Sequence, residues 1–222
     1  LGYRFMTVDS HPYDAQRWYA KAQDVASPPI AAGKLTVYAI GFWDPDDEFD
    51  VVIDNAVGPS GQVQATCNTR GGYTMVGGGV RGNTWGVRAS FPSSPSSWQA
   101  ITRDAITTQV YTLAMRPRDP SKYNINVQIT TQSFGAGEGR FSRNIAAPAG
   151  YTLVGGGAWN KQVAAKHTIK KGGLFHKKKT ITLMGEPSMG CAPSLASDGR
   201  WTVGRDDGVI SGPKGPRQML IY

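Results

Sequence analysis

The chain has 222 residues, of which 40% are hydrophobic, so it contains enough apolar material for one sizeable domain or two small ones. No apolar run approaches the roughly 20 residues of a membrane helix, and the sequence shows no secretory signal pattern. The net charge is +8, and two cysteines are too few for a disulfide scaffold. The 28 glycines and 14 prolines favour short strands and tight turns.

Residues 1–42, here unit 1, predict the back half of a repeated unit. A Ser-x-Pro run at Ser10 leads to Trp18, and Asp24 follows six residues later. The run "LTVYAI" (35–40) has the length and composition of a strand. The same pattern recurs twice with a front half before it. We therefore expect that the front half of unit 1 has been removed or lies upstream in a longer polypeptide, and a first residue other than Met agrees with this.

Residues 43–118, here unit 2, predict a complete copy made of four strands. Its segments share strand length and β-branched or aromatic composition: "FDVVID" (49–54), "GQVQATC" (61–67), "YTMVGGG" (73–79), and a return through Ser90, Pro92, Trp98 and Asp104 to "TQVYTLAM" (108–115). We interpret Cys67 as a small buried hydrophobe. A bridge to Cys191 is the alternative.

Residues 119–222, here unit 3, repeat the same segments with one insertion. The matching runs are "INVQIT" (125–130), "GRFSRNI" (139–145), "YTLVGGG" (151–157), Trp201 with Asp207, and "RQMLIY" (217–222). Whether each tryptophan segment is a strand of its own is left open. The repetition predicts one structural domain in which the copies bury one another.

Glycines and tryptophans at matching positions are the candidate ligand-binding residues. Three glycines in a row mark a corner where the backbone bends or approaches another group closely. Packing is one interpretation, with the indoles forming a shared core. Ligand approach is the other, with indoles stacking on sugars and the aspartates accepting hydroxyl groups. The candidates are Trp18, Asp24, Gly77, Gly78, Gly79, Trp98, Asp104, Gly155, Gly156, Gly157, Trp201 and Asp207.

The lysine insertion, residues 161–179, concentrates most of the net charge. It contains seven lysines and no acid, so the remaining chain is nearly neutral. Such a patch attracts phosphate, sulfate, sialic acid or anionic lipid headgroups, and a solvated lysine loop is the alternative. Phe175 is its only aromatic residue for stacking bases, so no specific nucleic acid is expected. The candidate contacts are Lys170, Lys171, Lys177, Lys178 and Lys179.

The acidic run "DPDDEFD" (44–50) predicts a solvated turn between units, with a calcium loop as the alternative. No zinc-ligand spacing, phosphate loop or Ser/Cys-His-Asp order stands out, so we expect no cofactor, no metal site and no enzyme activity. Two acids meeting in space, as in a secreted hydrolase, are the catalytic alternative.

The repeated Tyr-Thr-x-Val-Gly-Gly-Gly runs and the Ser-x-Pro, Trp-x5-Asp unit resemble the β-prism repeats of bacterial proteins. They resemble in particular the C-terminal domains that follow the pore-forming module in bacterial MACPF insecticidal proteins. This resemblance implies three four-stranded sheets around a pseudo-threefold axis, with the first unit here lacking its front half. It also implies a secreted, lectin-like or membrane-targeting module with a pore-forming module upstream. The sugar-binding loops of jacalin-type lectins are not evident, so the sugar is left open.

The sequence therefore predicts an all-β, pseudo-threefold β-prism that recognises a glycan or an anionic membrane surface without chemistry. It would act outside the cell as the targeting part of a toxin or of a secreted defence protein, and several weak sites would give avidity. A structural or oligomerisation module is the first alternative, and a secreted hydrolase is the second.

Overall fold

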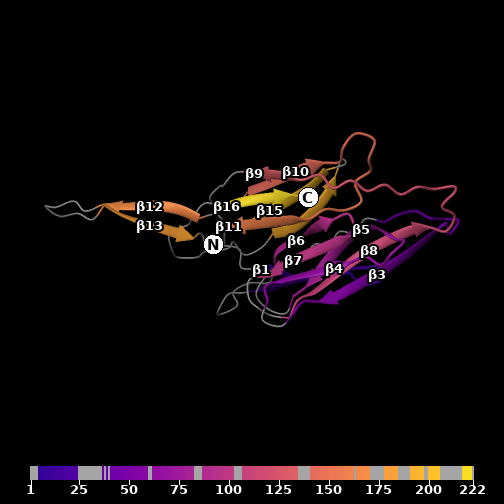
Figure 1. Ribbon diagram of the computed structural model, residues 1–222, viewed down its shortest axis with the longest axis horizontal. Coiled ribbons are helices and arrows are strands. Elements are labelled where there is room, and N and C mark those ends of the chain that lie inside the picture. The colour runs from indigo at the N-terminus through magenta and orange to yellow at the C-terminus, as the bar shows by residue number, and fades with distance from the viewer. Residues whose placement is uncertain are drawn as a thin grey trace.

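The computed structural model describes residues 5–24, 37, 39, 41–59, 62–82, 87–102, 107–134, 141–162, 164–170, 178–184, 191–197, 200–205 and 217–221. All regular structure in these residues is β-strand, and the strands pair antiparallel in curled sheets (Figure 1). The prediction of an all-β fold is confirmed. None of the described residues belongs to a helix that could cross a membrane.

The described residues form sixteen strands that follow the three predicted units in order. Unit 1 contributes β1 (Phe5–Pro12) and β2 (Trp18–Asp24). Unit 2 contributes β3 (Phe49–Val57), β4 (Gln64–Asn68), β5 (Thr74–Arg81), β6 (Val87–Ser94), β7 (Ser97–Thr102) and β8 (Gln109–Pro117). Unit 3 contributes β9 (Gln132–Phe134), β10 (Phe141–Ala146), β11 (Ala158–Gln162), β12 (Ala164–Lys170), β13 (Lys178–Met184), β14 (Cys191–Ser197), β15 (Arg200–Arg205) and β16 (Arg217–Ile221).

Unit 2 thus has six strands where the sequence predicted four. The Ser-x-Pro run and the tryptophan run form separate strands, β6 and β7, which pair as a hairpin with Pro92 opposite Trp98. The serines at the bend stabilise this turn, because Ser93 donates a hydrogen bond to the Ser97 carbonyl and the Ser96 amide donates to the Ser94 hydroxyl. The tryptophan segment is therefore a strand of its own.

The two larger sheets each combine strands from two units. The first sheet has the order β2-β1-β5-β8-β3, and the second has the order β4-β7-β6-β11-β16-β9. A third sheet, β10-β15-β14, and the hairpin β12-β13 belong to unit 3 alone. The contacts between copies match: β5 joins β1 with Val80 opposite Ser10, and β11 joins β6 with Ala158 opposite Ser90.

A buried cluster of apolar residues joins the first sheet to the second. The strands of unit 2 alternate between buried and less buried positions, as the period of two predicts. The cluster contains Ala65, Cys67, Met75, Val80, Val87, Trp98, Ala100 and Val110. Cys67 is 2% exposed and is a free thiol, so its interpretation as a small buried hydrophobe is confirmed. Burial raises the pKa of this thiol.

Two segments of unit 3 that were predicted as strands are not strands in the structure. Residues 125–130, the counterpart of β3, and 151–157, the counterpart of β5, lie outside all ladders among the described residues. In unit 2 both counterparts pair with β8. The β-branched composition of a segment therefore does not by itself produce a strand, because a strand also requires a partner.

Candidate functional site

The tryptophans of units 1 and 2 make the same internal contact. The indole N–H of Trp18 donates a hydrogen bond to the Ser10 hydroxyl (3.1 Å), and that of Trp98 donates to the Ser90 hydroxyl (2.9 Å). Trp98 is 3% exposed, and Trp18 is half-buried. The indole N–H groups are thus satisfied inside the fold, as buried tryptophans require. Trp201 lies in β15, and its side chain falls outside the described part of the chain.

The predicted glycine corners are positions where another backbone or an indole comes very close. A Cβ on Gly78 would lie 2.5 Å from both Trp98 Cδ2 and the Tyr111 carbonyl oxygen. A Cβ on Gly79 would lie 2.2 Å from the Ser10 carbonyl oxygen. Only glycine leaves room for these approaches. Gly79 therefore allows the close approach of β5 to β1, which joins unit 2 to unit 1.

Gly157 makes the same contact one unit further along the chain. A Cβ there would lie 2.2 Å from the carbonyl oxygen of Ser90, the counterpart of Ser10. Gly77 and Gly155 are less crowded, with nearest approaches of 3.8 Å and 3.2 Å, and Gly156 is half-buried. These contacts favour the packing interpretation at the third glycine of each run.

The predicted aspartates and lysines are only partly described. Asp24 is the last residue of β2. Asp104, Asp207, Lys171 and Lys177 lie outside the described residues. For these positions, the expected ligand contacts stay predictions.

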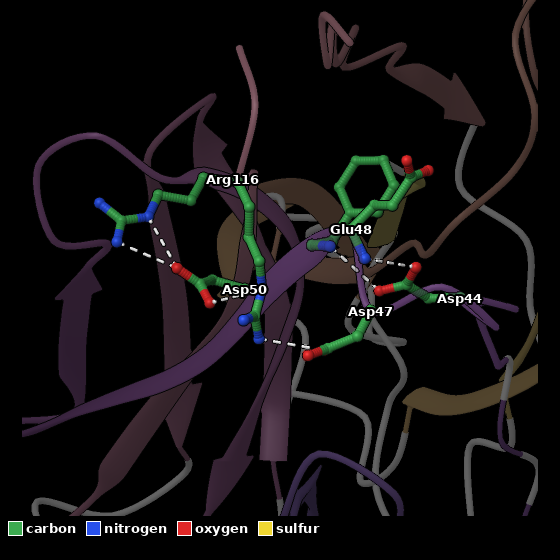
Figure 2. A network of polar contacts seen from close by, with 7 residues as sticks. Asp44, Asp47, Glu48, Asp50 and Arg116 are labelled. Carbon is green, nitrogen blue, oxygen red and sulfur yellow. Dashed lines mark hydrogen bonds and ion pairs between the residues drawn. The ribbon is translucent and has the colours of Figure 1, made fainter. Parts of the chain in front are cut away.

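The acidic run at 44–50 contains a turn that leads directly into β3 (Figure 2). The Asp44 carboxylate accepts hydrogen bonds from the backbone amides of Glu48 (2.9 Å) and Phe49 (3.0 Å). Asp47 has a φ of 53°, which Asp tolerates better than most side chains. Asp44 therefore stabilises the turn through the backbone.

Asp47 and Asp50 of this run pair with arginines of β8 and of the segment that follows it. Arg116 contacts Asp50 at 3.0 Å, and Arg118 contacts Asp47 at 3.0 Å and Asp50 at 3.3 Å (Figure 2). Each such surface pair contributes at most about 1 kcal/mol. Together they favour the turn interpretation over a calcium loop, because Asp47 and Asp50 already have partners of opposite charge.

A row of aromatic rings lies on the β1–β2 hairpin, and the sequence analysis missed it. His11 stacks on Tyr111 with 4.3 Å between ring centroids, and Tyr19 lies 5.4 Å from His11. Tyr13 lies 6.4 Å from Tyr19, and the Arg17 guanidinium lies 4.7 Å from the Tyr13 ring centroid. Tyr13 is 60% exposed and Tyr19 is 41% exposed. The row depends on the register of the hairpin, which places His11 opposite Tyr19.

The lysine insertion forms most of hairpin β12–β13, which extends away from the body of the molecule (Figure 1). The ladder runs from Ala164 opposite Met184 to Lys170 opposite Lys178, with Lys179 opposite Ile169. Two like charges directly opposite each other destabilise an antiparallel pair. The last two pairs of the ladder contain three lysines, so positive charge is concentrated at that end of the hairpin.

No family model, curated protein or solved structure matches the chain. The function must therefore be inferred from the fold, the contacts and the charge distribution.

Proposed function

We propose that this chain is a non-catalytic recognition module that binds an anionic surface through the hairpin β12–β13. The supporting observation is the cross-strand pair Lys170–Lys178, with Lys179 beside it. A two-stranded hairpin is marginally stable in water, and opposed lysines weaken it further. A phosphate, sulfate or carboxylate group bound by both lysines would turn this repulsion into attraction.

The fold that we propose around this hairpin is a pseudo-threefold β-prism of secreted type. The strands β1, β6 and β14 each precede and pair with the strand that contains the tryptophan of their unit. These three strands contact one another in all three pairings, as strands around a common axis would. The matching contacts of Gly79 and Gly157 support a repeated arrangement. In this proposal the chain is the targeting part of a toxin or defence protein, and the ligand is a glycan or membrane surface.

A charge-matched pair of variants tests the hairpin. The protein is mixed with phosphatidylcholine vesicles, with vesicles containing phosphatidylserine, and with heparin as a sulfated glycan. Near an anionic membrane each lysine contributes about 1 kcal/mol, so K170Q/K178Q should weaken binding about 30-fold. K21Q/K122Q removes the same charge elsewhere and should leave most of the binding intact.

The arms of the experiment separate the possible ligands. Binding to heparin alone assigns the hairpin to sulfated glycans, and binding to phosphatidylserine vesicles alone assigns it to lipid headgroups. Equal weakening by both variants would show that only net charge matters, and the proposed hairpin contact would then be wrong. Absence of binding in every arm would reject anionic recognition altogether.

The aromatic row supports a second candidate, the recognition of neutral glycans. Tyr13 and Tyr19 are 60% and 41% exposed, so a sugar could contact their rings, and the charged Asp14 and Arg17 beside them offer polar contacts. In unit 2 the positions of the two tyrosines are taken by Ser93 and Gln99, so this surface occurs in unit 1 and not in unit 2. Glycan-array signals that persist at 0.5 M salt, where exposed charges are strongly screened, and that disappear in Y13A/Y19A, would favour this candidate.

A further inference from the structure

The outward positions of strands β3 and β8 are mostly apolar, although the inward positions already supply the core. Along β8 the inward residues Val110, Thr112 and Ala114 are fully buried. In an antiparallel sheet with one solvated face, the residues between them are expected to be polar. The ladder of β3 and β8 instead places seven uncharged residues on the outward side: Val51, Ile53, Asn55, Val57, Gln109, Tyr111 and Leu113. These seven residues are here the β3–β8 outer face.

The β3–β8 outer face is open to solvent and carries no charge. Val51 is 41% exposed and Val57 is 59% exposed. The two polar residues of the face pair with each other, since the Gln109 side-chain amide donates a hydrogen bond to the Asn55 carbonyl oxygen Oδ1 (2.9 Å). The charged residues of both strands occupy the other positions: Asp50, Asp54 and Arg116. A contiguous apolar surface of this kind is typical of an interaction site.

A notch of bare backbone lies beside a projecting side chain on this face. Gly77 of β5 is opposite Leu113. A Cβ on Gly77 would meet only Leu113 atoms, at 3.8 Å, which is an ordinary van der Waals contact. Leu113 is half-buried, so an apolar side chain stands next to a position that has none. A twofold contact needs such a pair, because each copy must offer both the projection and the notch to the other.

The chemistry of the face favours a second copy of the chain as its partner. None of its seven residues is a lysine or an arginine, so it offers no cation to a phosphate, a sulfate or an anionic headgroup. An uncharged face can meet a copy of itself without opposing like charges, which would be costly. The charges beside it are also matched, since Arg116 contacts Asp50 and Arg70 contacts Asp54.

We propose that two copies of this chain form a twofold dimer through their β3–β8 outer faces, with Leu113 of each copy in the Gly77 notch of the other. The two sheets pack face to face, about 10 Å apart. Burial of the exposed valines supplies the driving force. The dimer carries two β12–β13 hairpins, so it binds a surface with many anionic groups more tightly than a monomer does. The dimer itself does not depend on that binding.

Sedimentation of the full 222-residue chain in the analytical ultracentrifuge tests the dimer. Over the micromolar range, the sedimentation coefficient should rise with concentration towards the value of a dimer. The rise should persist at about 0.5 M salt, because the contact is apolar and salt screens only charges. Loss of the association at high salt would contradict the apolar contact.

Two pairs of variants locate the interface. Gly77→Lys fills the notch and leaves the monomer unstrained, and it should weaken the dimer at least about a hundredfold because a twofold interface contains the change twice. Gly71→Lys is the matched control, because a Cβ at Gly71 meets nothing within 4 Å and Gly71 lies in the turn before β5. Val51→Lys on the face and Val63→Lys before β4 repeat the comparison at 41% and 39% exposure. Both controls should dimerise as the wild type does.

Four further results would overturn the proposal. The chain could stay monomeric at every concentration, or Gly71→Lys could weaken the dimer as much as Gly77→Lys. K170Q/K178Q could abolish the association, which would assign it to the hairpin; the proposed dimer requires that this variant associates normally, so the dimer and the anionic-surface contact fail separately. A monomeric chain that binds phosphatidylcholine vesicles and loses this binding in Gly77→Lys would assign the face to a lipid surface.

Discussion

Replacing the third glycine of either run with alanine should weaken the contact between two units and lower the free energy of unfolding. In Gly79→Ala the new Cβ would lie 2.2 Å from the Ser10 carbonyl oxygen and 2.5 Å from His11 Cα. In Gly157→Ala the corresponding distances are 2.2 Å to the Ser90 carbonyl oxygen and 2.5 Å to Phe91 Cα. Both obstacles are backbone atoms, so no side chain can rotate away. The neighbouring strand must move by on the order of 1 Å.

The size of the loss follows from the ladder at this joint. Strand β5 meets β1 through only two residue pairs, and β11 meets β6 through two as well. Overpacking costs about 1–3 kcal/mol, and each weakened hydrogen bond adds about 0.5–1.5 kcal/mol. Alanine restricts the unfolded chain and returns about 0.4–1 kcal/mol. We therefore expect each variant to lower the free energy of unfolding by about 2–4 kcal/mol, which is a large part of a typical total.

Urea denaturation followed by circular dichroism measures both losses. Gly71→Ala is the control, because a Cβ at Gly71 meets nothing within 4 Å, so stability should stay equal or rise slightly. The reasoning would be refuted if the Gly79 and Gly157 variants stayed within about 0.5 kcal/mol of the wild type, which is the usual range for uncritical surface changes. A large loss in one variant alone would show that the two joints are not equivalent.

Two further predictions concern single contacts. Arg70 donates to Asp54 (2.8 Å) and holds the pKa of that carboxyl below its usual value of 3.8, so the pair stabilises the fold above that pH and loses this effect as the pH falls through the lower folded-state pKa. Because Arg70 is 52% exposed, D54N should cost only about 0.5–1 kcal/mol at pH 7. In urea titrations this difference from the wild type should shrink below pH 4; a constant difference would contradict the ion-pair explanation. Trp98→Ala should cost about 3–5 kcal/mol in thermal unfolding, and Trp18→Ala should cost clearly less because Trp18 is half-buried. Equal losses would contradict the burial argument.

The sequence predicted the features that depend on local pattern and on repetition. The matching tryptophans and glycine runs indicated a copied unit. The contacts of Trp18 with Ser10 and of Trp98 with Ser90 show that corresponding residues are used in the same way. The strand length and the β-branched or aromatic composition of the apolar runs also indicated strands, and Cys67 was interpreted as a buried residue, which its 2% exposure confirms.

Features that depend on pairing between distant segments could not be predicted in this way. The residues 73–79 do not themselves indicate that β5 pairs with a strand of the preceding unit. That pairing depends on the position of the β1 backbone. The aromatic row depends on which residue of β2 faces His11. The segments 125–130 and 151–157 have the composition of strands, yet they lie outside the ladders among the described residues.

The repeated joints also explain how the side chains beside them could differ between copies. At the joint of units 1 and 2, Gly79 approaches the backbone of His11, and at the joint of units 2 and 3, Gly157 approaches the backbone of Phe91. The contact therefore depends on the backbone and the glycine, while the side chain that follows the serine is free to change. That freedom allows His11 to begin an aromatic row in unit 1, while Phe91 of unit 2 stacks on Trp159 of unit 3. In unit 3 the hairpin β12–β13 is inserted directly after β11, so the ladder with β6 is kept. Recognition is best sought in the features that differ between copies, because the shared features are already occupied in holding the units together.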